Sequence, residues 1–305
     1  MSTAHVVAVL LATVGAVLFG LGAVKQHGAV RAGAEASVDR QQGARRLLRL
    51  LKDRTWLAGA VQAAVAGGTH VVALTLAPIT LVQPVGVIAV PVTVVASAWK
   101  TGRRPSATQV VGSVLGVAGI AALTVLLLSP AAQPVELPRW GVLTGTVLAL
   151  VASTALVVAV PVAAGRPRAR VLALATLAAL LFGLNSVLLK VIGEAVRGGL
   201  AAADRPALLV AVAGIAASLP VGLWAMQAAY LHGSPQVVIC CLTLADPLTA
   251  VIGGYLLLGD GVDAGTATLL AAIACSLVAA AGVVVLSKEY PGEVAPQEPA
   301  TVTSV

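Results

Sequence analysis

The chain has 305 residues, of which 59% are hydrophobic and only 10% are charged, and its mean hydropathy is +0.99. A water-soluble domain of this length needs more charge to cover its surface, so the composition excludes that class. A net charge of +7 would suggest nucleic acid as a partner of a soluble protein. Here the basic residues flank apolar blocks, as in membrane proteins, and no nucleic-acid partner is expected.

The apolar residues fall in blocks of about 20, the length of a helix that crosses the hydrocarbon core. Barrel strands would alternate polar and apolar residues, so we predict an all-α fold, a polytopic membrane helix bundle. About nine spans are predicted in chain order, at residues 6–24, 55–76, 79–99, 107–128, 140–164, 171–192, 207–231, 237–258 and 266–286. The tail 288–305 is rich in Pro and Glu and is predicted to be disordered.

The positions of Lys and Arg predict the orientation of these spans. With nine spans, fifteen of the nineteen basic residues fall on one side, eight of them in a loop at 25–54. Cytoplasmic loops carry this excess, so we expect a multi-pass plasma-membrane protein with its N-terminus outside and its C-terminus in the cytoplasm. The basic segment Arg45–Arg54 is expected to lie on the inner leaflet and to contact the lipid bilayer there.

Features of the first half of the chain recur in the second half in the same order. Leu18-Phe19-Gly20-Leu21 matches Leu181-Phe182-Gly183-Leu184, and Pro78 to Pro91 matches Pro235 to Pro247 within one residue. The matches predict two four-helix repeats, 1–129 and 171–287, joined by a linker helix in 130–170. A single linker helix inverts the second repeat, as in many secondary transporters. Chance similarity between Ala/Val/Leu-rich helices is the alternative.

Asp246 is the outstanding polar residue, because it lies near the middle of the span 237–258 and directly before Pro247. A carboxylate at membrane depth costs several kcal/mol unless it is paired or hydrated. The proline removes one backbone donor and frees a carbonyl one turn earlier, so we predict a helix break there. Asp246 is therefore the candidate metal ligand or proton acceptor, and a hydrogen bond between helices is the alternative.

Four further polar residues are candidates for lining the path of a solute: His70, Gln83, Asn185 and Gln227. Each also fits an ordinary hydrogen bond between helices. Pro84 and Pro91 are predicted to break the third span. Gly112-x-x-x-Gly116 is a motif for close helix packing, either within the bundle or in a homodimer.

No arrangement of residues typical of an enzyme occurs in the chain. The four histidines are scattered, and there is no phosphate-binding loop, nucleophile elbow or metal-ligand spacing. We therefore predict that the protein is not an enzyme, with no catalytic residues and no cofactor.

Three stretches of the chain resemble the drug/metabolite transporter superfamily. They are ALTLAPITLVQPVGVIAVPVTVV at 73–95, GSVLGVAGIAAL at 112–123 and YLHGSPQVVICCLTLADPLTAVIGGYLLLGD at 230–260. LLLGD is similar to the ending common in the EamA-type branch. The nine-span plan, the APITLVQP turn and the region of Lys25 look most like the NIPA-like branch, whose members are linked to magnesium transport. In that branch the second helix carries an acidic residue, where this chain has Gly67.

The resemblance and the repeat together imply a secondary membrane transporter of a small polar metabolite or cation that works by alternating access. A NIPA-like permease for magnesium or another divalent cation is the alternative within transport. A flippase or membrane scaffold that contacts lipid, without solute flux, is the alternative from a different class.

Overall fold

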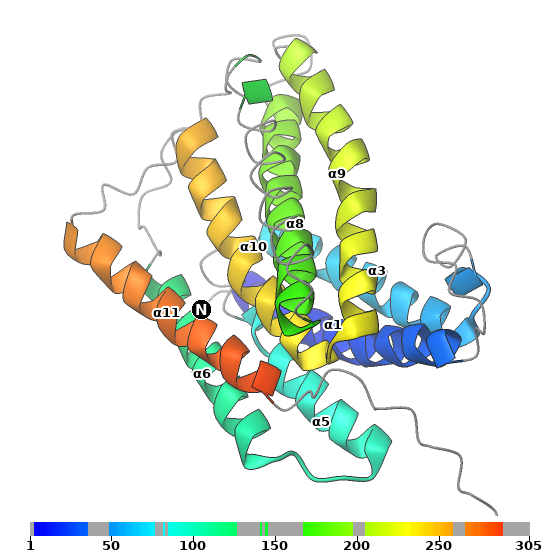
Figure 1. Cartoon of the computed structure of the whole chain (residues 1–305). Helices are drawn as coiled ribbons and strands as arrows, with labels where there is room; N and C mark the ends of the chain where they lie inside the picture. Colours follow the sequence, from blue (N-terminus) through cyan, green and yellow to red (C-terminus); the bar gives the residue numbers. More distant parts are fainter. Residues whose placement is uncertain are drawn as a thin grey trace, which may run out of the picture.

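A computed structural model describes residues 3–35, 49–76, 82, 85–126, 141, 144–145, 167–197, 205–258 and 266–288. Its helices are α1 (Thr3–Glu35), α3 (Arg54–Leu76), α5 (Ala89–Thr101), α6 (Ala107–Leu126), α8 (Pro167–Arg197), α9 (Arg205–His232), α10 (Pro235–Leu258) and α11 (Thr266–Lys288) (Figure 1). These described residues contain no strand. The prediction of an all-α fold is confirmed for this part of the chain.

Five helical segments in the described ranges are long and apolar enough to cross a membrane. They are Thr3–Ala34, Arg54–Ala73, Arg168–Gly193, Arg205–His232 and Leu270–Lys288. Shorter apolar stretches lie in α6 and α10. The chain is therefore a multi-pass helical membrane protein. The predicted span 140–164, apart from three of its residues, and the tail from 289 lie outside the described residues.

The first helix is longer than predicted. A loop is predicted from Lys25 onward, but α1 continues to Glu35. Polar residues such as Gln26 suggested the end of the span, yet Gln26 is buried against other helices, where its amide finds polar partners. Residues 45–48 of the predicted surface segment Arg45–Arg54 lie outside the described residues, and Leu50, in the described remainder, is buried in the main core.

Pro91 and Pro247 have different effects on their helices. α5 begins only at Ala89, after a turn, so Pro91 lies in its first turn, where the missing N–H costs no helical bond. Gln83 and Pro84 lie outside the described residues. α10 is continuous through Pro247, so the break predicted there is wrong. Helices in membranes tolerate a proline because packing on neighbouring helices and the flanking turns hold the backbone.

A capping box begins α6, just after Gly102 has closed α5 in the left-handed conformation, with φ 64°. The N–H of Gln109 donates to Ser106 Oγ over 3.1 Å, and the N–H of Ser106 donates to Gln109 Oε1 over 3.2 Å. Two backbone donors at the start of the helix are satisfied in this way.

Replacing Ser106 with Ala removes the acceptor of the Gln109 N–H, so we expect the free energy of unfolding to fall by about 1 kcal/mol. Ser106→Asp keeps an acceptor at this position and should keep the stability. The apparent melting temperature in detergent measures both variants. Equal melting of Ser106→Ala and the unmodified protein would contradict a stabilising cap.

The helix contacts follow one pattern in the two halves of the chain. α1 packs on α3 and α5, and α5 packs on α6. In the second half α8 packs on α9 and α10, and α10 packs on α11. Between the halves, α6 lies along α11, α5 contacts α10, and α1 contacts α9 (Figure 1).

Glycines bring α6 and α11 into contact at the level of their backbones. A Cβ added to Gly282 would lie 2.5 Å from the nitrogen of Gly116 and 2.7 Å from the carbonyl oxygen of Gly112. A Cβ added to Gly119 would lie 2.5 Å from the nitrogen of Ala279. The Gly112-x-x-x-Gly116 motif thus serves packing within the chain, the first of its two predicted uses.

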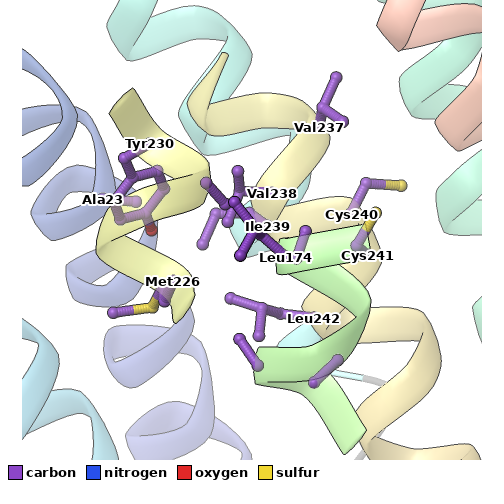
Figure 2. Packing of buried hydrophobic residues seen from close by; sticks show 14 of the residues in the cluster. Ala23, Leu174, Met226, Tyr230, Val237, Val238, Ile239, Cys240, Cys241 and Leu242 are labelled. Atoms are coloured by element: carbon purple, nitrogen blue, oxygen red, sulfur yellow. The ribbon is translucent and has the colours of Figure 1, made fainter. Parts of the chain in front are cut away.

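The main core lies where the C-terminal half of α9, the first turns of α10 and the first half of α8 meet α1 and α5. Figure 2 shows Tyr230 and Met226 of α9 beside Val238 and Ile239 of α10, with Leu174 of α8 close by. Cys240 and Cys241 are free, buried thiols in this core. This apolar centre fixes the positions of α8 and α10, the two helices that carry the candidate site.

Candidate functional site

Asp246 lies on α10 and is hydrogen-bonded to Ser186 of α8. The two helices approach closely because Gly183 has no side chain. A Cβ at Gly183 would lie 2.6 Å from the carbonyl oxygen of Asp246 and 2.5 Å from the Cβ of Thr249. The carboxylate is partly buried and belongs to a helix of almost wholly apolar composition. Its charge in such a setting is costly, which marks it as a candidate for binding a cation.

Asn185, next to Ser186 in α8, is directed to α9. Ser218 Oγ lies 2.7 Å from Asn185 Oδ1 and 2.6 Å from the carbonyl oxygen of Gly214. A hydroxyl has one proton, so it can donate to only one of these two oxygens. When the Ser218 hydroxyl donates to Gly214, the Asn185 amide takes the flipped orientation. The amide nitrogen then donates to Ser218 Oγ, and the amide oxygen becomes a free buried acceptor. In the other orientation Asn185 Nδ2 has no partner among the described residues.

Gln227 takes part in a separate polar cluster nearer the C-terminal end of α9. Trp56 Nε1 of α3 donates to Gln227 Oε1 over 3.0 Å. Gln227 Nε2 donates to Gln26 Oε1 of α1 over 2.5 Å. Gln26 is 3% exposed and Gln227 is 5% exposed. We call Gln26, Trp56 and Gln227 the glutamine cluster.

The predicted pathway residues do not form one site within the described part of the chain. Asp246 contacts Ser186 between α10 and α8, Asn185 contacts Ser218 of α9, Gln227 belongs to the glutamine cluster, and Gln83 lies outside the description. His70 is partly buried on α3. Its neighbour in the sequence, Thr69, packs on Gly15 of α1. No group of three or more His, Cys, Asp or Glu side chains that could hold a metal ion occurs among the described residues.

Ser186, Gln26 and Trp56 are residues that sequence reasoning missed. Ser186 is a single hydroxyl in an apolar span, and such hydroxyls commonly bond to their own helix; its one proton can go either to the carbonyl oxygen of Phe182, 3.2 Å away, or to the carboxylate of Asp246. Gln26 stood in the segment predicted as a loop. An extension of the helical pattern past Lys25 is the one signal that could have found it.

A family model described as Magnesium transporter NIPA matches residues 3–237. The match covers more than half of the 305 residues and runs from α1 to the first turn of α10. It ends before Asp246, so the candidate carboxylate lies outside the matched residues. No curated protein and no solved structure matches the chain. The predicted NIPA-like resemblance is confirmed, and the chain belongs to the NIPA magnesium transporter family.

Proposed function

We propose that this protein is a secondary transporter that moves a divalent cation across the membrane by alternating access. Magnesium is its main proposed substrate. The observation that carries the proposal is the family match over residues 3–237, which covers most of the helical bundle. The helices long and apolar enough to span a membrane support it.

Asp246 is the residue that we assign to the cation. Mg²⁺ gives up its water reluctantly and usually keeps several water molecules when a protein binds it. A site with one carboxylate and neighbouring neutral oxygens suits such a hydrated ion. Asp246 would attract the cation, while the hydroxyl oxygen of Ser186 would accept a hydrogen bond from one of its water molecules.

Two inverted repeats, 1–129 and 171–287, with the linker in 130–170, are part of the proposal. The matching contacts within α1, α3, α5 and α6 and within α8 to α11 support them. The matched glycines Gly20 and Gly183 also have matching neighbours. A Cβ at Gly20 would lie 2.9 Å from the carbonyl oxygen of Ala89, in the first turn of α5, as one at Gly183 would meet the backbone of α10.

The repeats differ in the residue that precedes the second proline. It is Val90 before Pro91 in the first repeat and Asp246 before Pro247 in the second. Only the second repeat therefore carries a carboxylate at this place, and the proposed cation site lies within that repeat, between α8 and α10.

The orientation belongs to the same proposal. The excess of basic residues supports a plasma-membrane protein with its N-terminus outside and its C-terminus in the cytoplasm. In this orientation α1 and α9 both end near the cytoplasmic face, and Arg45–Arg54 lies at the inner leaflet. Impermeant maleimide labelling of single cysteines placed at positions 45 and 136 tests it. Labelling from outside at 45 and not at 136 would overturn it.

Purified protein in proteoliposomes with a trapped magnesium-sensitive dye tests the proposed function. We expect an influx of Mg²⁺ about tenfold or more above that of protein-free vesicles. Flux no greater than in protein-free vesicles would contradict magnesium transport. Movement of labelled lipid between leaflets without Mg²⁺ flux would instead support a flippase.

A further inference from the structure

The contacts between the two proposed repeats are unequal at the two ends of the bundle. We propose that the glutamine cluster, Gln26, Trp56 and Gln227, is the gate that closes the cytoplasmic end of the transport path. We propose His70 and Leu189 as the counterpart that closes the opposite end when this gate opens. The inference rests on the proposed function, because alternating gates are needed only by a transporter.

The glutamine cluster joins the two repeats. Gln26 and Trp56 come from α1 and α3 of the first repeat, and Gln227 comes from α9 of the second. Both hydrogen bonds, of 3.0 and 2.5 Å, therefore cross the boundary between repeats. One turn further along α9, the rings of His27 and Tyr230 meet edge to face, with centroids 6.3 Å apart. The contact between α1 and α9 thus extends over two layers.

The described residues do not make the matching contact on the opposite side of the repeats. If α1 corresponds to α8 and α3 to α9, then the counterpart of the α1–α9 contact is a contact between α8 and α3. The described residues of α3 and α8 do not form an interface comparable to that of α1 and α9. Figure 1 shows the upper ends of α8 and α9 standing away from α1 and α3. Among the described residues, the two proposed repeats therefore contact each other at one of these two places and not at the other.

The repeat identifies the residues that should meet in the other state. Gln26 stands six residues after Gly20, and Leu189 stands six residues after Gly183. Gln227 stands eight residues before Pro235, and His70 stands eight residues before Pro78. The pair Gln26–Gln227 thus corresponds to Leu189–His70. Leu189 is 55% exposed, so another side chain can cover it in the other state.

The chemistry of the glutamine cluster suits a contact that breaks and forms again. Its hydrogen bonds join neutral amides and an indole, so no charge is left unpaired in the membrane when they separate. The separated amides can bond to the water that enters an open path. Two inverted repeats that exchange conformations would then close His70 against Leu189 as Gln26 leaves Gln227.

Cross-linking tests both gates, in a protein whose Cys240, Cys241 and Cys275 are replaced by Ala. One variant carries Gln26→Cys with Gln227→Cys, and a second carries His70→Cys with Leu189→Cys. A short reducible bis-thiosulfonate linker should join each pair, stop Mg²⁺ flux, and release it again when reductant is added. A control pair within the second repeat, Phe182→Cys with Gly222→Cys, joins neighbouring side-chain positions of α8 and α9. Linking this control should leave the flux unchanged.

A variant without the cluster's amides gives a readout that does not depend on transport. Gln26→Leu with Gln227→Leu removes both amides together, which buried positions tolerate better than the loss of one, and leaves only the indole N–H of Trp56 without its acceptor. Added to the His70–Leu189 pair, it should raise the linking yield of that pair about threefold, as the population shifts toward the other state. Mass spectrometry of peptides measures the yield.

Three outcomes decide the question. Unchanged flux after linking of Gln26→Cys to Gln227→Cys overturns the cytoplasmic gate. Failure of the 70–189 pair to link, with or without the leucine substitutions, overturns the counterpart. Absence of Mg²⁺ flux in the unmodified protein would count against the proposed function. The linking yields do not depend on flux, so they would still report whether the two pairs close alternately.

Discussion

Replacement of Asp246 by Asn should lower the Mg²⁺ flux of proteoliposomes at least about tenfold, a loss of about 1.4 kcal/mol in the interaction with the ion. Asparagine has nearly the same shape and keeps an oxygen that can accept the hydrogen bond of Ser186. It lacks the negative charge that attracts a hydrated dication in a medium of low dielectric constant. The same substitution should leave the melting temperature unchanged or raise it, because a buried charge is costly to the fold.

The matched control is Asp53→Asn, which also removes one carboxylate. Asp53 Oδ1 accepts the N–H of Trp56 over 2.7 Å at the start of α3. Asn caps helices as well as Asp, so flux and stability should both be retained. Undiminished flux in Asp246→Asn would falsify the assignment of this residue to the cation. A fall in flux together with a fall in melting temperature would point to structural damage instead.

A second large effect is expected from Gly282→Ala, which should lower the free energy of unfolding by about 1–3 kcal/mol. The new methyl group would lie 2.5 and 2.7 Å from backbone atoms of Gly116 and Gly112. Backbone atoms of a helix cannot rotate away as a side chain can, so α6 and α11 must move apart. The apparent melting temperature in detergent and the yield of folded protein measure the effect.

Gly68→Ala is the control for this prediction, because no atom lies within 4 Å of a Cβ added there. It lies in the interior of α3, where alanine favours the helix more than glycine does. Its melting temperature should therefore stay the same or rise. Similar melting of the two variants would show that the close approach of α6 and α11 does not stabilise the fold.

Hydropathy predicted most helices well because each apolar block is long enough to span a bilayer. α3 is Arg54–Leu76 where 55–76 was predicted, and α6 begins at Ala107 as predicted. The end of α1 was missed because polar residues after Lys25 were taken for a loop. Gln26 is buried where its amide bonds to Gln227, which belongs to a helix distant in sequence. Single-sequence patterns do not contain that partner.

The candidate site could be predicted in part. Asp246 was evident because a charge in an apolar block has few explanations. Its partner Ser186 was not, because a serine in such a block carries no pattern, and only the close approach at Gly183 brings α8 to α10. The break at Pro247 was wrong because local rules for proline omit the support that surrounding helices give.

The backbone contact between α6 and α11 has a consequence for the order in which the protein is made. α6 ends at Leu126, but the helix that lies along it begins only at Thr266. During synthesis, α6 therefore enters the membrane before the helix that covers its glycines has been made. A chain that is truncated before α11 would leave these glycines without their packing partner. Membrane quality control could recognise the truncated chain by this exposed helix face.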